Sequence, residues 1–305
     1  MKIPPLVQFA SVLWIGFFVS AQAIEIQGHS AAENDRFADD PSFIGAAYDW
    51  SGVGRATTGT AGKGGHWATM ISSNVFLSAN HYYPGTETSL YFYPDNDAGS
   101  SPVVRTITGG QRIGTSDLWI GTIDSALPNT ISYYNWANQS LNVATYALSM
   151  VADENALTAG ITSTATGYGA DKRTSMAVGR NVIDQFLTLT VAGTTAPALR
   201  TLEEISGDTG LVSYESQLAS GDSGGPLFID DGGELLLVGI NWAIGQVDID
   251  LHPTREDLRD ASYYSYVGNY ATEIQNYVDA HAVPEPSPAL SFLTGLGLLT
   301  ARRRR

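Results

Sequence analysis

The stretch Ser220-Gly221-Asp222-Ser223-Gly224-Gly225-Pro226-Leu227 decides how this 305-residue chain is interpreted. A serine hydroxyl is a poor nucleophile, so it needs a base beside it and donors for the oxyanion that it creates. Glycines on both sides let the backbone turn sharply and bring N–H groups close to a reacting carbonyl. Apolar residues follow Pro226 and indicate a strand. The stretch therefore predicts Ser223 as a nucleophile that a loop presents in front of a strand.

A candidate base lies well before this serine, in Met70-Ile71-Ser72-Ser73-Asn74-Val75-Phe76-Leu77-Ser78-Ala79-Asn80-His81. The pattern indicates a strand, a turn at Ser73-Asn74, a second strand, and a histidine where that strand ends. Histidine suits general-base catalysis because its unperturbed pKa lies close to neutral pH. Together with the serine stretch, this position predicts His81 as the base.

A candidate carboxylate precedes the apolar run in Ser116-Asp117-Leu118-Trp119-Ile120-Gly121-Thr122-Ile123-Asp124. A carboxylate at the start of an apolar strand is costly to bury unless it is hydrogen-bonded, so Asp117 would need a partner. Asp117 is therefore the residue that we predict to orient the imidazole of His81. Asp124 is the competing candidate, although the Ser-Ala-Leu-Pro after it has the composition of an exposed turn.

The rest of the body has a β pattern. Short apolar, β-branched stretches are bounded by Gly, Asn, Asp or Ser, as strands are, in residues 67–71, 75–78, 89–93, 103–107, 144–150, 186–191 and 235–240. Many short strands with glycine-rich turns favour a sandwich or a barrel. Val267, Tyr270, Ile274 and Val278 recur at helical spacing and predict a C-terminal amphipathic helix over residues 263–281.

These segments resemble the trypsin/chymotrypsin-like serine endopeptidases, whose chain order is histidine, aspartate, serine. The resemblance covers residues 43–281 and includes Thr166-Gly167-Tyr168-Gly169 and Gly239-Ile240-Asn241-Trp242-Ala243. It implies an all-β fold of two antiparallel six-stranded β-barrels, roughly residues 43–130 and 131–260, followed by the C-terminal helix. It also implies a serine endopeptidase whose active site lies between the barrels.

The resemblance implies roles for individual residues. His81 would take the proton of Ser223, Asp117 would hold the imidazole, and the N–H groups of Gly221 and Ser223 would form the oxyanion hole. Substrate-binding positions carried over from the family are Gln217, Asn241, Trp242 and Ala243. A neutral amide at position 217 and a methyl group at Ala243 favour small or medium neutral substrate side chains. If the alignment of this loop slips, Glu215 becomes the candidate for the pocket base.

The chain also departs from the family pattern. It has no cysteine, and Tyr82 stands where disulfide-bonded relatives have one after the histidine. No Arg/Lys-Ile-Val-Gly-Gly activation segment is present. Phe43-Ile44-Gly45-Ala46 is the nearest approximation, and removal of a leader would expose Ile24. Asp222 either pairs with such an amine or only shapes its loop.

Both ends have the composition of targeting signals. Residues 1–23 combine Lys2, a short apolar run and a final Ala21-Gln22-Ala23, which is typical of a secretory signal cleaved by signal peptidase. Residues 24–42 would then form an N-terminal extension. We expect an exported protein that resides in the periplasm, at the cell surface or outside the cell.

The tail from 282 to 305 holds Val283-Pro284-Glu285-Pro286-Ser287, an apolar segment and four arginines. Arginines after an apolar segment resist translocation. This order of a Pro-Glu-Pro motif, an apolar segment and arginines resembles the PEP-CTERM sorting signal of Gram-negative bacteria. The resemblance implies a transient membrane tether and processing by an exosortase.

Composition and charge exclude other classes. The net charge of −15 argues against binding a nucleic-acid backbone, and protein or peptide substrates remain the expected partners.

We expect no cofactor and no catalytic metal, because the histidines outside the candidate site lack metal-ligand spacing: His29, His66, His252 and His281. Asp95-Asn96-Asp97 could contribute to a calcium loop but is interpreted as a solvated turn. The competing hypothesis is a non-catalytic surface protein that keeps a protease-like fold for binding.

Overall fold

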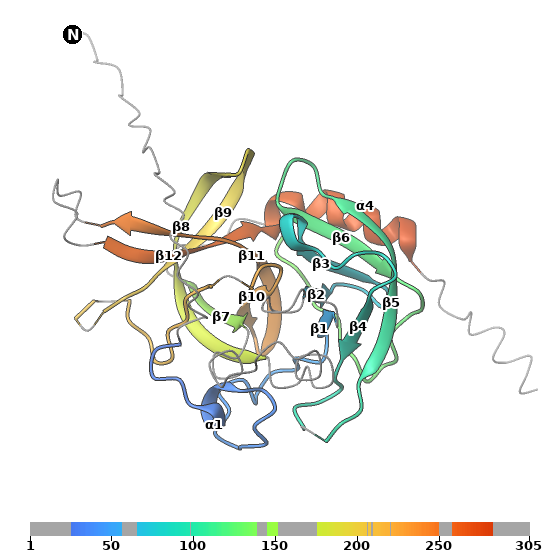
Figure 1. Cartoon of the computed structure of the whole chain (residues 1–305), viewed down its shortest axis with the longest axis horizontal. Coiled ribbons are helices and arrows are strands. Elements are labelled where there is room, and N and C mark those ends of the chain that lie inside the picture. The colour runs from blue at the N-terminus through green and yellow to red at the C-terminus, as the bar shows by residue number, and fades with distance from the viewer. Residues whose placement is uncertain are drawn as a thin grey trace, which may run out of the picture.

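The computed structural model of the chain describes residues 26–56, 66–97, 99–138, 145–151, 176–205, 207–208, 210–219, 221–249 and 258–282. Over these residues the protein forms two closed antiparallel barrels of six strands each, with a helix at the C-terminal end (Figure 1). The predicted all-β, chymotrypsin-like class is confirmed.

The first barrel has the strand order β1-β2-β3-β6-β5-β4. Its strands are β1 (Val53–Ala56), β2 (Trp67–Met70), β3 (Val75–Ala79), β4 (Ser89–Phe92), β5 (Val103–Arg112) and β6 (Leu118–Ile123). β3 pairs with β6 so that Ala79 lies opposite Leu118. This register brings the residues that follow β3 next to the residues that precede β6.

The second barrel has the strand order β10-β11-β12-β9-β8-β7. Its strands are β7 (Thr145–Val151), β8 (Ala177–Val191), β9 (Thr194–Leu202), β10 (Pro226–Asp231), β11 (Glu234–Asp248) and β12 (Leu258–Tyr266). β8 and β11 are long strands, and the register of β11 with β12 shifts between Asn241 and Ala243, as at a β-bulge. Because β10 starts at Pro226, the serine loop leads directly into the barrel.

The described part of the chain also contains the helices α1 (Ala31–Asn34), η1 (Asn80–Tyr82), η3 (Val267–Tyr270) and α4 (Ala271–His281). The predicted start of the C-terminal helix at Tyr263 is wrong. Residues 263–266 belong to β12, which pairs with both β11 and β9. The helical spacing is real only from Val267 onward, and Ile274 is the buried anchor of α4.

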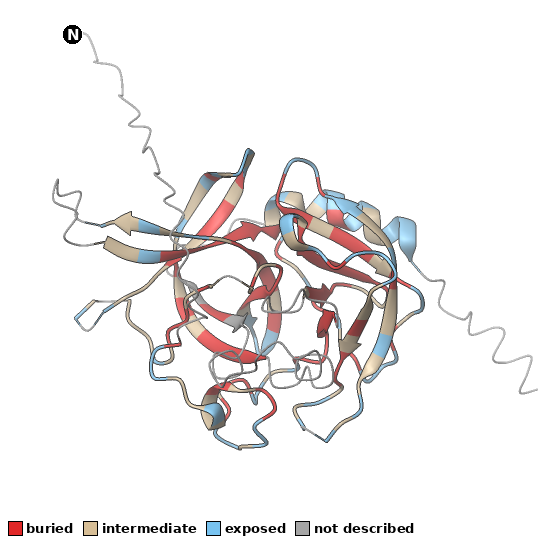
Figure 2. Ribbon diagram, viewed as in Figure 1, coloured by how far each residue is buried: buried red, intermediate tan, exposed pale blue. Residues whose placement is uncertain are grey.

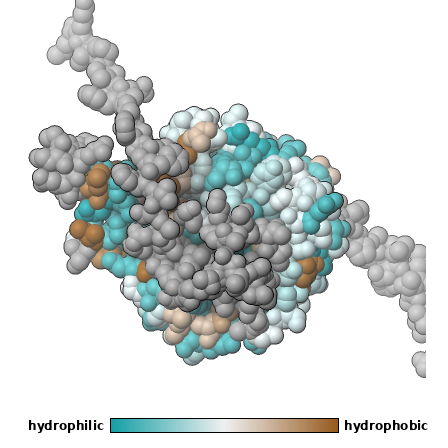
Figure 3. Space-filling model, in the orientation of Figure 1, coloured by the Kyte–Doolittle hydropathy of each residue, from teal (hydrophilic) through white to brown (hydrophobic). Residues whose placement is uncertain are grey.

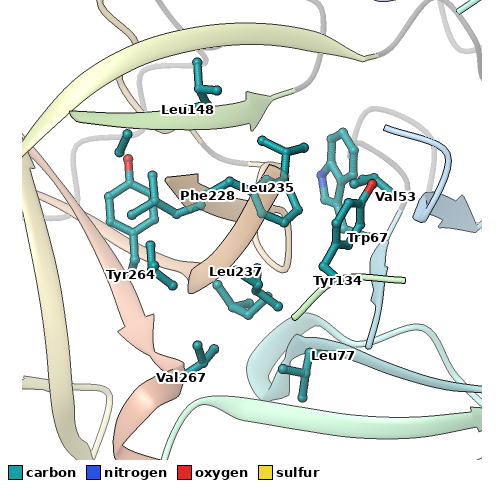
Figure 4. Packing of buried hydrophobic residues seen from close by; sticks show 14 of the residues in the cluster. Val53, Trp67, Leu77, Tyr134, Leu148, Phe228, Leu235, Leu237, Tyr264 and Val267 are labelled. Carbon is teal, nitrogen blue, oxygen red and sulfur yellow. The ribbon is translucent and has the colours of Figure 1, made fainter. Parts of the chain in front are cut away.

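The core runs through both barrels and the space between them (Figures 2 and 4). Phe228 of β10 lies at its centre, with ring centroids 4.7 Å from Tyr134 and 5.9 Å from Trp50. Tyr134 belongs to the segment between the barrels. This cluster of buried residues therefore contains side chains from both barrels, while two further clusters lie around Phe76 in the first barrel and around Trp242 in the second.

The predicted boundary between an N-terminal extension and a body at residue 43 does not match the packing. Ile26 forms a bridge with Ser216, Asp35 forms one with Ala177, and Asn34 is buried with its Nδ2 donating to Val178 O. The described part of residues 24–42 is thus built onto the second barrel.

The signal at 1–23, Ile24, the Thr166–Gly169 turn and the tail from 283 onward lie outside the described residues. Among the helices that are described, we find none with the length and apolar character needed to cross a membrane. The described surface in Figure 3 is largely hydrophilic, with a few separate hydrophobic patches.

Candidate active site

The structure brings His81 and Asp117 together at one end of the first barrel. His81 lies in η1 directly after β3, and Asp117 directly precedes β6. Nδ1 of His81 lies 2.6 Å from Oδ2 of Asp117, and the main-chain N–H of His81 donates to Oδ1 at 3.0 Å. Asp117 is only 2% exposed. Both carboxylate oxygens thus have a hydrogen-bond partner, as a buried carboxylate requires.

Ser223 reaches the same histidine from the second barrel. Its Oγ lies 2.8 Å from Nε2 of His81, on the opposite side of the ring from Asp117. The imidazole side chain is 42% exposed. The three side chains therefore form a continuous hydrogen-bonded chain that runs from a buried carboxylate to an accessible hydroxyl.

The backbone around Ser223 has the shape that an anion-binding loop needs. Gly221 and Gly224 have φ values of 121° and 89°, which L-residues rarely adopt. The N–H of Asp222 donates to Ala219 O, while the N–H groups of Gly221 and Ser223 donate to no residue that the structure describes. These two N–H groups belong to Ser223 itself and to the residue two positions before it.

Asp222 and Asn241 hold this loop in place. Asp222 is 2% exposed, and its Oδ2 accepts the N–H of Ala219 at 2.7 Å. Asn241 Nδ2 donates to Asp222 O at 3.0 Å, and Asn241 O accepts the N–H of Gly224. Asn241 thereby acts on the loop that carries Ser223 and anchors it to β11.

Gln217 lies against β12. Its Oε1 accepts a hydrogen bond from Ser262 Oγ at 3.0 Å, and Ser262 Oγ in turn accepts the N–H of Leu218 at 2.8 Å. This arrangement fixes which end of the amide faces Ser262. Nε2 of Gln217 is then a buried donor that has no hydrogen-bond partner among the described residues.

Glu215 is engaged elsewhere. Its two carboxylate oxygens accept the main-chain N–H groups of Glu204 and Val212. Burial raises the pKa of Glu215 to about 7, and the nearby carboxylates of Glu204 and Glu203 act in the same direction. The alternative alignment, which makes Glu215 the pocket base, is therefore disfavoured by its contacts.

Trp242 and Ala243 follow Asn241 in β11. The indole of Trp242 is only 6% exposed and packs in a cluster with Leu189, Ala196 and Tyr263, under strands β8 and β9. Trp242 can therefore offer a substrate little beyond its backbone. Ala243 is half-buried.

The residues that were alternative candidates for the site also have identifiable positions and contacts. Asp124 is exposed at the far end of β6 from Asp117. The N–H of Ile44 donates to Glu33 O within the chain.

In the Asp95–Asp97 turn, the buried guanidinium of Arg36 donates to Asn96 Oδ1, Tyr93 O and Asp95 O at 2.9–3.0 Å. A side-chain cation thus holds this turn through Asn96 Oδ1 and two main-chain carbonyls, while Oδ1 of Asp95 and Oδ1 of Asp97 accept main-chain N–H groups.

The other described histidines have local partners. His29 pairs with Asp35 at 3.0 Å, the His66 ring lies tilted against Tyr82 with centroids 4.0 Å apart, and His281 bonds Tyr277 O. No cluster of His, Cys, Asp or Glu suited to a metal occurs among the described residues. His252 lies outside them.

No local sequence pattern marks Arg112, which supports the site from β5. Its guanidinium donates to Ser116 O at 2.5 Å, Thr115 O at 2.7 Å and Thr194 Oγ1 at 2.9 Å. It therefore ties the loop that carries Asp117 to the hairpin between β8 and β9. Thr194 is far away in sequence, so only the folded chain reveals the contact.

Comparison with known proteins places this chain in a family. The family model described as Trypsin matches residues 50–254, which is more than half of the chain. The protein belongs to the trypsin family and has the fold of its serine proteases. Among solved structures, it is similar to the crystal structure of the Rv3671c protease in its inactive form. The identity is 14%, the TM-score is 0.46, and the alignment covers 78% of this chain and 95% of that one. No curated protein matches.

Proposed function

We propose that the protein is an active serine endopeptidase that hydrolyses peptide bonds through an acyl-enzyme on Ser223. The single observation that carries this proposal is the unbroken hydrogen-bonded chain from Asp117 through His81 to Ser223. A non-catalytic relative has no need to keep all three groups within hydrogen-bonding distance.

In the proposed mechanism, His81 Nε2 accepts the proton of Ser223 Oγ as this oxygen attacks the peptide carbonyl. The same imidazolium then protonates the leaving amine. Asp117 keeps the Nδ1–H tautomer and stabilises the imidazolium. The N–H groups of Gly221 and Ser223 bind the oxyanion, and losing one such donor typically costs about 3–4 kcal/mol of barrier.

We also propose that Gln217 and Ala243 shape the pocket for the substrate residue before the scissile bond. The pocket would take small or medium neutral side chains, because no charge is available at its base. The unpartnered Nε2 of Gln217 favours side chains that bring an acceptor, since an unsatisfied buried donor costs about 1–3 kcal/mol.

Export and sorting complete the proposal. A secretory signal over 1–23 and a PEP-CTERM-like tail over 282–305 would direct the protein out of a Gram-negative cytoplasm and hold it briefly in the membrane. Mass spectrometry of both termini after expression in an exosortase-bearing host tests this. Intact termini on the exported protein would contradict it.

The catalytic proposal is tested by Ser223→Ala, with Ser125→Ala as the matched control at an exposed serine. We expect Ser223→Ala to lower turnover of casein on the order of a millionfold with little change in the unfolding temperature. Ser125→Ala should cleave as fast as the wild type. Undiminished cleavage by Ser223→Ala would refute the assignment, and a wild type without activity would favour the binding-protein hypothesis.

A further inference from the structure

A groove of about 640 Å³ lies away from the triad, between the segment that links the barrels and the start of α4. Its volume falls within the roughly 300–1,000 Å³ typical of small-ligand sites. The linker contributes Asn135, Trp136 and Asn138, and α4 contributes Thr272, Gln275 and Asn276. None of these residues belongs to the proposed catalytic machinery.

The groove is well separated from Ser223. It includes Asp231, the last residue of β10, whereas the serine loop enters β10 at its first residue, Pro226. Five steps of about 3.3 Å put these two ends about 17 Å apart. A ligand in the groove would therefore not contact the peptide bond that is cut.

The polar side chains that line the groove are free to bind a ligand. No hydrogen bond joins the side chains of Asn135, Asn138, Thr272 or Asn276 to another described residue. Gln275 uses only its Nε2, which donates to Asp279 at 2.7 Å, so its Oε1 is available. Each carboxamide offers both donors and an acceptor.

The charges of the groove limit the ligand class. Among the described residues that line it, Asp231 is the single charged side chain, and none is a lysine or arginine. A phosphate or carboxylate ligand would find a repelling carboxylate and no cation. A peptide would find few apolar recesses in the described lining, whose aliphatic residues are Leu236, Ala137 and Ala271.

Trp136 gives the groove a flat apolar wall in a fixed position. Its side chain is half-buried against the core, and Trp136 forms a parallel bridge with Leu237 of β11. The N–H of Ala137 donates to Leu237 O, and the N–H of Leu237 donates to Asn135 O, both at 2.9 Å. The indole is therefore held by a strand-like backbone before any ligand arrives.

We propose that this groove binds a neutral saccharide. A sugar ring has an apolar face of C–H groups that can stack on the indole of Trp136. Its rim of hydroxyls, each a donor and an acceptor, matches carboxamides and a single carboxylate. Neutral sugars match this lining better than anions or peptides do, because they need neither a cation nor apolar recesses. The inference does not depend on the proposed catalytic function.

Titration of the full chain with cellohexaose, mannohexaose and chitohexaose tests the proposal, with calorimetry and tryptophan fluorescence as readouts. We expect at least one of them to bind with a Kd below about 10 mM. Trp136→Ala should weaken that binding at least about tenfold, and Asn276→Ala several-fold. Trp119→Ala is the matched control, because Trp119 is also half-buried but lies in β6, where it stacks on Tyr83.

If Trp136→Ala does not fold, the exposed Asn276→Ala and Gln275→Ala variants decide the question. The proposal is overturned if none of the three sugars binds. It is also overturned if the groove variants bind the sugars as tightly as the wild type does. A third contradicting result would be a change in tryptophan fluorescence when a casein-derived peptide is added but none when the sugars are added. Sugar binding by a wild type that shows no proteolysis would refute the catalytic proposal alone.

Discussion

Gly224 shows how tightly the residues after the proposed nucleophile are constrained. Its φ is 89°, and a β-carbon there would lie 2.7 Å from Ser78 Oγ and 3.2 Å from the main-chain nitrogen of Ala79. The loop of the second barrel thus packs directly on β3 of the first. Only glycine permits both this backbone conformation and this close approach.

We expect Gly224→Ala to lower the free energy of unfolding by about 2–4 kcal/mol, from backbone strain and the clash together. Peptidase activity should fall on the order of a hundredfold because Ser223 is displaced. Gly193→Ala is the matched control, since Gly193 also has a positive φ of 81° but nothing within 4 Å. Chemical denaturation checks both variants, and equal losses at the two sites would contradict the close-contact argument.

The amide of Gln217 leads to a prediction about specificity. In Gln217→Glu, Ser262 can still donate to the side chain, but the buried donor is replaced by a carboxylate. We expect cleavage after arginine or lysine to rise on the order of tenfold or more relative to cleavage after neutral residues. A peptide library with one varied position measures this ratio. An unchanged ratio would place Gln217 outside the substrate pocket.

At the scale of single residues, the groups of the candidate site could be predicted from the sequence because each lies beside a strong local signal. His81 and Asp117 flank apolar strands, and Ser223 lies in a glycine-rich loop. The orientation of the Gln217 amide could not be foreseen, because it depends on Ser262, which lies in a different strand.

Among the elements, the N-terminal segment contributes more than its sequence suggests. Arg36 is almost completely buried, and burial lowers its pKa to about 10, so it stays charged at neutral pH. Its guanidinium holds the turn after β4 through two main-chain carbonyls and Asn96. The segment therefore joins the first barrel to strand β8 of the second.

Arg36→Met is expected to destabilise the protein by about 3–5 kcal/mol, since it leaves buried carbonyls without their charged donor. Arg105→Met is the matched control. Arg105 also donates to three main-chain carbonyls, at Val104, Ser125 and Ala126, but it is less buried. Urea denaturation of both variants should show a much smaller loss for Arg105→Met. A loss for Arg36→Met no larger than that of the control would contradict a structural role for the buried cation.

Element boundaries were predictable where pattern and pairing agree. Residues 75–78 were expected as a strand and form most of β3. The start of the C-terminal helix was missed because residues 258–266 pair with β9 and β11, which are distant in sequence. Helical spacing that begins at Val267 was extended backward over tyrosines whose burial comes from the sheet.

At the scale of the whole molecule, the pH dependence of the free energy of unfolding should depend on Glu215. Its pKa rises from 4.5 to about 7 in the folded protein, so folding favours the protonated form. This contribution is fully present below about pH 4.5 and is lost as the pH rises through 7. We expect the unfolding temperature of the wild type to fall between about pH 5 and pH 8. Glu215→Gln should have a flatter profile over that range, and parallel profiles would contradict the raised pKa.

The two-barrel architecture of the whole molecule was predictable mainly from the order of the candidate site motifs along the chain, and less from the strand patterns. Two barrels were expected because His81, Asp117 and Ser223 occur in the order of a known family. The shared core around Phe228 and the groove at Trp136 could not be foreseen, since both depend on how the linker between the barrels packs.

The most direct test of the central claim is the intact mass of the protein after incubation with a fluorophosphonate, followed by peptide mapping. We predict one adduct on the wild type, at Ser223, and none on the His81→Ala variant, because labelling requires a serine that the imidazole activates. An adduct at another serine, or equal labelling of wild type and His81→Ala, would contradict the claim.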